Sequence, residues 1–382
     1  AEGISPMKHI DSLVVGLGAM GSATLYHLAR MGQQAVGIEQ FRTGHELGSS
    51  HGHSRAFRVF YRDPLYTELA AAALPLWQDL QAATTEPLLS LCGFLAFART
   101  GNPLFERNLA AIRHSQADFE LLTSRDITAR FPALEISDSH TACFTPQAGF
   151  LDASRCVTAH LAGATGLGAT VHQQVCVERI ETIGARTIVR TTAGDFRTRR
   201  LILTAGPWAA DLLSPLQLPL TVTRQQKFYF QPTCPAALRP DVLPVYADYD
   251  TRFYGFPMHG PGLKVADDTR GRQTHPNRVD RTMERAAEVP LSDWLKNIMP
   301  QHDFQFLESS TCLYTGTPDL DFLIGPHPDH PGILAGAGFS GHGFKFSTLI
   351  GLILAQLAVD GSTPYPIERF ALDRFSRSRR QQ

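Results

Sequence analysis

The sequence lacks several features that mark particular classes of protein. Its six cysteines include no Cys-x-x-Cys pair and no metal-like spacing, so we expect free thiols in a reducing cytoplasm. No apolar stretch reaches the roughly 20 residues that span a bilayer. The formal net charge is only −1, which offers no basic surface for nucleic acid. These absences favour a globular cytoplasmic protein with neither a membrane nor a nucleic acid as partner.

What is present is a chain long enough for two domains. Ala1 to Pro6 precede the first methionine and resemble residues added for recombinant expression, so we exclude them when we predict the fold. The outer thirds of the chain alternate strand and helix patterns, whereas the centre holds short strands. This pattern predicts a mixed α/β chain in which an antiparallel substrate domain is inserted into a discontinuous, Rossmann-like nucleotide domain. We expect the nucleotide domain at 7–85, 145–215 and 312–382, and the substrate domain at 86–144 and 216–311.

Local patterns add further expectations. The segment from Gly44 to Arg58 is rich in Gly, Ser and His, which predicts a functional loop that runs into a helix. Pro75 should kink or divide a helix expected over 66–82. A helix is also expected over 278–299, and a Gly194-Asp195 turn should join two strands of a hairpin.

The first chemical motif is a glycine fingerprint near the N-terminus. Gly16, Gly18 and Gly21 follow a short strand and open a helix, and Glu39 ends the next strand. Glycines at this spacing let the backbone approach a pyrophosphate at the helix N-terminus, while the carboxylate accepts hydrogen bonds from a ribose. A carboxylate disfavours a 2′-phosphate, so FAD or NAD fits better than NADP. The alternative is a glycine-rich turn that binds nothing.

The second motif surrounds Cys312, in Thr311-Cys312-Leu313-Tyr314-Thr315, and a glycine-rich run from Gly338 to Phe346 follows it. A lone cysteine is ordinarily an inert core residue. Together with the fingerprint, however, these segments resemble the family of monomeric sarcosine oxidase and N-methyltryptophan oxidase. The resemblance implies a two-domain FAD-dependent oxidoreductase in which Cys312 carries FAD through an 8α-S-cysteinyl bond. Such a bond requires a thiolate, and therefore positive charge near the thiol.

The resemblance also assigns roles to residues of the segment from Gly44 to Arg58, which we call the basic loop. His51 and Arg55 match a flavin-proximal pair of the family, and Arg58 matches an arginine that binds the substrate carboxylate. Ser50 and His53 stand where the family often has histidine and aspartate. A solvated basic loop is the alternative, and we expect no metal because no third ligand accompanies the two histidines.

Lys264 matches the family's oxygen-activating lysine. A fixed cation stabilises the negative charge that develops when O₂ accepts an electron. Taken alone, a surface lysine lying along an apolar strand would explain it as well. Tyr254 precedes it in the expected pocket, and Asp268 stands where the family commonly has a substrate-proximal histidine, a departure that bears on the identity of the substrate.

Lys345 matches the family's second carboxylate-binding residue, the partner of Arg58. Gly341 and Gly343 should bring a helix N-terminus against the flavin, and Tyr314 should line the pocket. A lysine merely exposed in a first helical turn is the alternative. Two cations on one carboxylate would make a specific anchor for an amino acid.

The function implied by the resemblance is oxidation of a secondary amine in an amino acid, such as sarcosine or another N-methyl amino acid. The products would be an aldehyde, a primary amine and H₂O₂, with O₂ as acceptor and a monomeric enzyme. A related oxidase of cyclic (pipecolate-type) or glycated (fructosyl) amino acids stays open. Two other classes stay open as well: a non-catalytic nucleotide-binding protein and an NAD-linked dehydrogenase.

Overall fold

A computed structural model describes residues 8–379, so Ala1–Pro6, which resemble residues added for expression, lie outside the described part. The first of two eight-stranded sheets contains the fingerprint. Its parallel centre is formed by β1 (Lys8–Val15), β2 (Ala35–Glu39), β9 (Thr170–Gln173), β12 (Gly194–Leu203) and β19 (Ile333–Ala337). The strands β10 (Val177–Ile183), β11 (Arg186–Thr191) and β18 (Leu323–Pro326) add antiparallel pairs.

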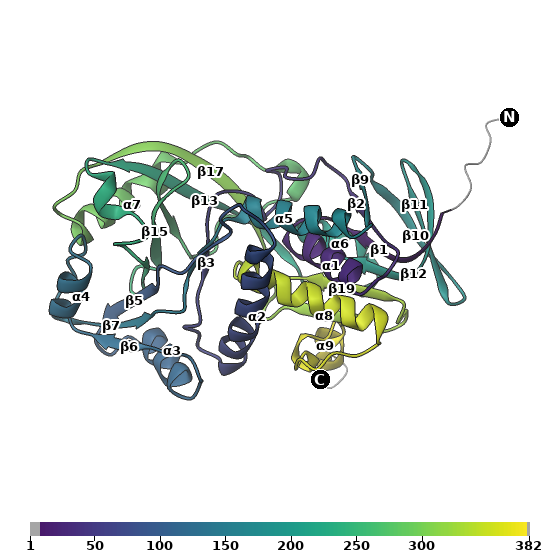
Figure 1. The fold of residues 1–382 in the computed structure, drawn as a ribbon, viewed down its shortest axis with the longest axis horizontal. Helices are drawn as coiled ribbons and strands as arrows, with labels where there is room; N and C mark the ends of the chain where they lie inside the picture. The colour runs from purple at the N-terminus through teal and green to yellow at the C-terminus, as the bar shows by residue number, and fades with distance from the viewer. Residues whose placement is uncertain (1–7, 380–382) are drawn as a thin grey trace.

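Three helices pack together beside this sheet (Figure 1): α1 (Ala19–Arg30), α5 (Ala153–Gly166) and α8 (Ser347–Val359). The helix α8 is apolar on nearly all sides, and most of its residues are buried, as expected for a helix enclosed by neighbours. A further helix, α2 (Pro64–Ala82), packs against α8. The N-terminal and C-terminal thirds of the chain therefore share one core.

The second eight-stranded sheet occupies the other half of the molecule (Figure 1). Its order is β17 (Phe304–Gly316), β13 (Thr221–Pro232), β16 (Gly262–Asp267), β15 (Phe253–His259), β14 (Val245–Asp248), β5 (Phe94–Arg99), β7 (His140–Thr145) and β6 (Glu120–Leu122). All pairs are antiparallel except β14 with β5. The helices α3 (Pro103–Arg113), α4 (Ser124–Arg130) and α7 (Arg285–Ile298) belong to this half. The remaining strands, β3 (Arg55–Phe57), β8 (Gly149–Leu151) and β4 (Leu89–Ser90), form a small three-stranded sheet.

The expected fold class, a mixed α/β chain with one Rossmann-like and one antiparallel sheet, is confirmed. The domain boundaries stay a proposal, which the division of strands between two sheets supports. One boundary, between 311 and 312, falls inside β17, because this long strand runs without a break from Phe304 to Gly316.

Four local expectations need correction. The loop that begins at Gly44 runs into strand β3, and a helix begins only at Pro64. Pro75 does not divide α2, which is anchored on both sides of it by buried side chains. The hairpin turn lies at residues 192–193, before Gly194, which already pairs with Thr191.

The fourth correction concerns the helix expected over 278–299, which begins only at Arg285. Tertiary contacts hold the preceding segment out of helical conformation. Arg281 donates to the carbonyl oxygens of Glu46 (3.2 Å), Leu47 (2.7 Å) and Thr311 (3.2 Å), so its side chain is committed to the opposite loop.

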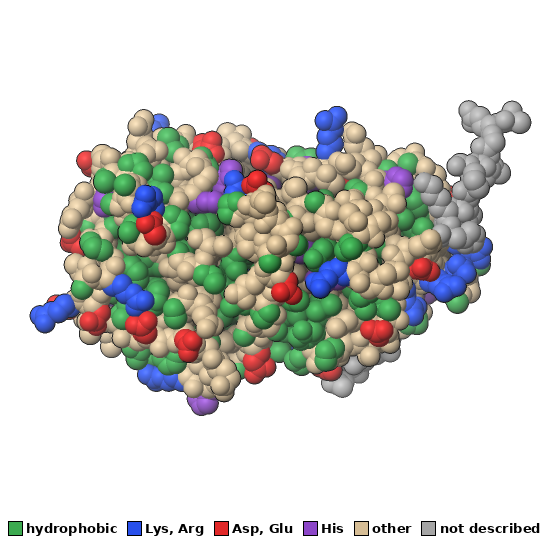
Figure 2. Space-filling view, in the orientation of Figure 1, with side chains coloured by type: hydrophobic (Ala, Val, Ile, Leu, Met, Phe, Trp, Pro, Cys, Tyr) green, Lys and Arg blue, Asp and Glu red, His purple; other side chains and the backbone are tan. Residues whose placement is uncertain are grey.

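On the face shown in Figure 2, charged side chains of both signs are interspersed with apolar ones, and no single sign dominates. In the described part of the chain, no helix has the length and apolar character needed to cross a membrane.

Candidate functional site

The glycine fingerprint forms a tight turn between β1 and α1. Gly16 has a φ of +87°, a conformation that glycine adopts readily. A Cβ on Gly21 would lie 1.9 Å from the Gly16 carbonyl oxygen, so only glycine permits this approach. The backbone N–H of Ala19, at the start of α1, donates to Ser50 Oγ at 2.9 Å. The N-terminus of α1 is thereby tied to the basic loop.

Glu39 lies at the end of β2 and is buried. Its carboxylate accepts hydrogen bonds from the N–H groups of Leu17 (2.8 Å) and Phe41 (3.1 Å), which fix its position beside the fingerprint. A carboxylate offers about four lone-pair directions, so acceptor capacity remains for the hydroxyls of a ribose.

An elongated cavity of about 390 Å³ runs from the fingerprint to the glycine-rich C-terminal run. Its lining includes the predicted residues Gly16, Gly18, Glu39, His51, Arg55, Tyr314, Gly341 and Gly343. Thr315 Oγ1, on the same wall, is buried without a hydrogen-bond partner in the described part of the chain. A dinucleotide with polar groups along its length fits these features.

A second cavity of about 430 Å³ adjoins the first. Five residues line both cavities and form the wall between them: Arg55, Tyr314, Ser340, Gly341 and Phe344. Gly341 is required there, because a Cβ at this position would lie 2.5 Å from the Tyr314 ring. The second cavity contains Arg58, Tyr254, Lys264, Asp268 and Lys345, all of which were predicted as site residues.

Arg58 and Lys345 converge on one aromatic ring in the second cavity. The Arg58 guanidinium carbon lies 4.1 Å from the Tyr61 ring centroid, and Lys345 Nζ lies 5.5 Å from it. Lys345 Nζ also donates to the His342 carbonyl oxygen at 2.8 Å. Burial, and then the charge of Arg58, lower the pKa of Lys345 well below its usual value. An anion between the two cations would relieve both effects.

Trp77 anchors the segment that carries Lys345. This fully buried side chain of α2 donates its Nε1–H to the Lys345 carbonyl oxygen at 2.7 Å. Its ring is nearly parallel to that of Phe344, with an interplanar angle of 7°. No local sequence pattern predicts this contact, because 268 residues separate the two partners.

Lys264 is buried on β16 and points toward the basic loop. Its Nζ donates to Ser54 O at 2.6 Å and to Ser54 Oγ at 3.2 Å, and lies 4.0 Å from the Phe256 ring centroid. Burial, followed by the charges of Arg55 and Lys227, lowers the pKa of Lys264 well below its usual value.

His51 and Arg55 are held by backbone groups. Arg55 donates to the carbonyl oxygens of Ser49 (2.9 Å), His51 (2.7 Å) and Ser54 (2.9 Å). His51 Nε2 lies 3.1 Å from the Thr311 carbonyl oxygen, so we assign its proton to that nitrogen. Burial and the charges of Lys227 and Arg55 lower the pKa of His51 to about 2, which leaves the imidazole neutral.

Cys312 is buried on β17, next to Leu313 and Tyr314, which line the first cavity. The side chain of Cys312 itself does not line that cavity. Sequence reasoning missed its neighbour Lys227, a lysine of β13 that is only 3% exposed. An inward position in an apolar strand could have revealed this lysine.

Asp268 and Arg252 form an ion pair at the rim of the second cavity, with 2.8 Å between Arg252 NH2 and Asp268 Oδ2. Both side chains are partly exposed. Asp268 therefore presents a carboxylate, already partnered, at the position where the family commonly has histidine.

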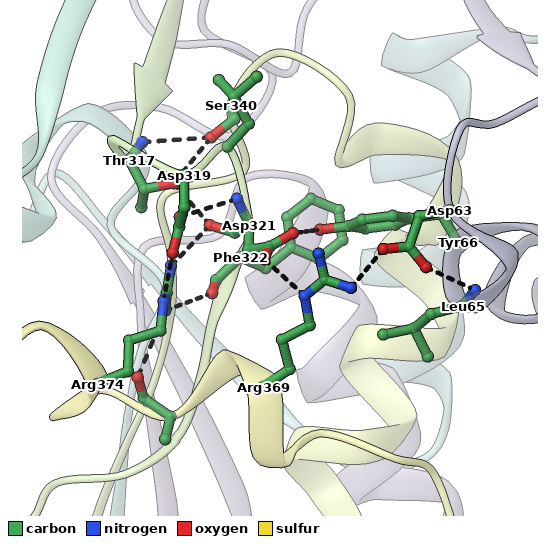
Figure 3. Close-up of polar contacts among 12 residues, drawn as sticks. Asp63, Leu65, Tyr66, Thr317, Asp319, Asp321, Phe322, Ser340, Arg369 and Arg374 are labelled. Atoms are coloured by element: carbon green, nitrogen blue, oxygen red, sulfur yellow. Dashed lines mark hydrogen bonds and ion pairs between the residues drawn. The ribbon is translucent and has the colours of Figure 1, made fainter. Parts of the chain in front are cut away.

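The wall of the second cavity near Asp321 is tied to the C-terminal segment (Figure 3). Asp321 accepts from Tyr66 OH at 2.8 Å and from Arg369 Nε at 2.7 Å, and Arg369 also contacts Asp63. Arg374 donates two hydrogen bonds to Asp319. These contacts fix the loop after β17 against α2.

Within the described residues, no group of three or more histidine, cysteine, aspartate or glutamate side chains could hold a metal ion. The histidines of the basic loop belong to no such group.

A glycine fingerprint, a ribose-binding acid and an adjoining cationic cavity define a flavin- or nicotinamide-dependent oxidoreductase, and comparison with known proteins decides between them. Residues 11–357 match the family model described as FAD dependent oxidoreductase, and the chain belongs to this family. Its cofactor is FAD.

Among relatives, the chain is 34% identical to the monomeric sarcosine oxidase of Streptomyces avermitilis, over 94% of this chain and 96% of that protein. It is 28% identical to the N-methyl-L-tryptophan oxidase of Yersinia pestis, over 96% of this chain and 99% of that protein. A solved structure of NikD, described as an unusual amino acid oxidase essential for nikkomycin biosynthesis, superposes with a TM-score of 0.83 at 26% identity, covering 96% of this chain and 97% of that one. The resemblance read from the sequence is confirmed.

Proposed function

We propose that this protein is an oxidase of secondary amines in amino acids, which converts an N-methyl amino acid to a primary amine and an aldehyde and reduces O₂ to H₂O₂. One observation carries the proposal: two cations, the half-buried Arg58 and the buried Lys345, converge in a cavity that shares a wall with the dinucleotide cavity. An amino acid held there by its carboxylate has its amine end free to face that wall. The printed names of the relatives agree with this substrate class.

The chain's own residues bind and orient the substrate. Arg58 and Lys345 hold the carboxylate, and aromatic side chains of the cavity, among them Tyr254 and Tyr314, exclude water from the amine. Bound FAD supplies the acceptor for the hydride of the amine's carbon and the donor of electrons to O₂. The substrate amine reacts in its neutral form, and the imine product hydrolyses to the aldehyde and the primary amine.

The cations beside the shared wall serve the second half of the reaction. Lys264 and Arg55 donate only to backbone and hydroxyl oxygens, and neither has an ion pair with a carboxylate in the described residues. Their charge stabilises the anion that forms when O₂ takes an electron. Neutral His51 helps to hold this loop through its bond to Thr311.

We further propose that Cys312 carries the FAD covalently, and that the enzyme is a monomer of the reducing cytoplasm. No two cysteines of the described chain form a disulfide, which agrees with a reducing compartment. Acid precipitation tests the bond: the yellow colour should stay with the precipitated wild-type protein and should appear in the supernatant of Cys312→Ser.

A peroxide-coupled screen tests the activity. Sarcosine and larger N-methyl amino acids should produce H₂O₂ and bleach the flavin spectrum in the absence of O₂, whereas their amides should react poorly. A flavin spectrum that no amino acid bleaches would contradict the proposal and favour a nucleotide-binding protein without catalysis.

A second candidate is oxidation of cyclic or glycated amino acids. The Asp268–Arg252 pair at the cavity rim favours it, because these charges could hydrogen-bond to a polar ring or sugar. Including pipecolate and fructosyl amino acids in the screen separates the two substrate classes.

A further inference from the structure

Lys227 lies on the face of the antiparallel sheet that carries Cys312. In the register of β13 with β17, Lys227 is opposite Ser310 and Gln225 is opposite Cys312. Residues two apart on one strand share a face, so Lys227 is the diagonal neighbour of Cys312, a separation that a long side chain can bridge. On the same face, Tyr229 pairs with Lys264 of the next strand.

Lys227 forms no ion pair with a carboxylate of the described residues, and Glu46 acts on its charge only more weakly than Arg55 does. The side chain is 3% exposed, and its Nζ donates to the His51 carbonyl oxygen at 3.3 Å. Its neighbours Arg55 and Lys264 are also cationic. A buried ammonium without a counter-ion is costly, so the fold is suited to an anion at this place.

Burial and neighbouring charges shift the pKa values of the groups around Lys227. Burial and the charges of Lys227 and Arg55 hold the pKa of His51 near 2, and burial raises the pKa of Tyr229 to about 12. Burial and the charge of Arg55 lower the pKa of Lys227 to about 8, so the side chain is still mostly protonated at pH 7. The charged or titratable groups around Lys227 are Glu46, His51 and Arg55 of the basic loop, Tyr229 of β13, Lys264 of β16 and Cys312 of β17.

We propose that Lys227 is a positioning residue for flavin attachment, whose ammonium group holds the Cys312 thiolate as an ion pair. The inference rests on the proposed covalent bond at Cys312. It assigns to this chain's own lysine the positive charge that a reactive cysteine requires.

The chemistry balances with the oxidant that the proposed activity already uses. Cys312 Sγ forms a bond to the 8α carbon of the flavin, and one C–H bond of that carbon breaks. The two electrons released in this oxidation pass through the flavin ring to O₂, which also takes up the thiol proton and the proton from the 8α carbon. One thiol, one FAD and one O₂ therefore give one thioether-linked FAD and one H₂O₂.

Three variants test the role of the charge. Lys227→Met keeps the length of the side chain and removes the ammonium, Lys227→Arg keeps a cation, and Gln226→Met is a matched control whose side chain points to the opposite face. Each protein is purified with the FAD it binds and incubated in air at pH 7 to 9.5, and the fraction of flavin that stays with the acid-precipitated protein is followed over time.

We expect Lys227→Met to attach flavin about 10- to 100-fold more slowly at pH 7, because without the cation less of the thiol is present as thiolate. Higher pH should restore the rate, since the thiol then ionises without help. Lys227→Arg and Gln226→Met should behave like the wild type. A role in packing alone would show no recovery at high pH.

Two results would overturn the proposal: full attachment in Lys227→Met at pH 7, or slow attachment that stays slow at pH 9.5. Should Lys227→Met bind no FAD, Lys227→Gln provides the neutral side chain for the same pH comparison, and wild-type attachment in that variant counts against the role. If the wild type itself releases all its flavin into acid, the covalent assignment at Cys312 has failed instead.

Discussion

Lys264 is a single buried charge whose role can be separated from substrate binding. Lys264→Met keeps the apolar stem of the side chain beside Phe256. It removes the ammonium group, which donates a hydrogen bond to the Ser54 carbonyl oxygen. Electron transfer to O₂ creates an anion in a water-poor site, where a fixed cation contributes about 3–5 kcal/mol. We therefore expect reoxidation of reduced flavin by O₂ to slow by about two to four orders of magnitude, while anaerobic reduction by substrate changes much less.

Stopped-flow absorbance of the two half-reactions provides the measurement. Lys296→Met, which removes an exposed lysine of α7, serves as the matched control and should leave both rates unchanged. Normal reoxidation together with a collapse of flavin reduction would identify Lys264 as a substrate residue.

The carboxylate clamp is also testable at single residues. In Lys345→Met, the substrate carboxylate loses one of its two cationic partners, a loss of roughly 2–5 kcal/mol. The apparent affinity for an N-methyl amino acid should fall about 30-fold to several thousand-fold. The amide of the same substrate has no anion, so its affinity should barely change. Equal losses for the acid and the amide would exclude contact between Lys345 and the carboxylate.

How far the site could be predicted depended on whether each residue belongs to a recognisable segment. The spacing of Gly16, Gly18 and Gly21 with Glu39 is local. Gly16, Gly18 and Glu39 line one cavity, and Gly21 packs against Gly16 beside it. The resemblance named Arg58 and Lys345, which line one cavity although they are far apart in sequence. Lys227 was missed because its importance arises only when strand register places it diagonal to Cys312.

At the scale of elements, close contact between β1 and α1 depends on glycine. Gly21→Ala would place a Cβ 1.9 Å from the Gly16 carbonyl oxygen, so the strand and helix must separate where the pyrophosphate should bind. We expect loss of bound FAD, measured as the flavin-to-protein absorbance ratio, and a lower melting temperature. Gly166→Ala is the control, because nothing lies within 4 Å of its Cβ at the end of α5. It should retain FAD and gain up to about 1 kcal/mol of stability. Retention of FAD by Gly21→Ala would contradict this role of the turn.

Helices and strands were predicted correctly where the spacing of apolar residues in the sequence agrees with the burial of those residues, as in α1, β2 and α8. It failed where distant residues decide the conformation. Residues 279–284 have helical character in sequence, yet Arg281 is held by three carbonyl oxygens from other segments, and α7 begins later. The strand β3 exists because β8 supplies its hydrogen bonds, a partner nearly a hundred residues away.

At the scale of the whole molecule, a hydrogen-bonded group joins three helices from distant parts of the chain. His27 of α1 and His160 of α5 each place Nε2 near Thr348 Oγ1 of α8, at 3.3 and 3.4 Å. All three side chains are buried. One hydroxyl can donate to one imidazole and accept from the other, and the imidazole that accepts must be neutral. The junction of these helices should therefore be sensitive to acid.

The direction of this sensitivity follows from the pKa values. Burial, followed by the charge of Arg30, lowers the pKa of His27 to about 4 in the folded protein, against 6.5 for an unperturbed histidine. As pH falls below 6.5, the unfolded chain takes up this proton first, so the free energy of unfolding decreases until about pH 4. The difference of about 2.5 units corresponds to about 3 kcal/mol, and burial lowers the pKa of His160 in the same direction.

We expect His27→Gln, which keeps a hydrogen-bonding group near Thr348 but cannot be protonated, to lose less stability than the wild type between pH 7 and pH 4.5. Thermal midpoints at several pH values measure the two slopes. His114→Gln, at an exposed histidine after α3, should follow the wild-type slope. The comparison isolates one proton, because every other titrating group is common to the three proteins. Parallel slopes for His27→Gln and the wild type would show that His27 does not couple the junction of α1, α5 and α8 to pH.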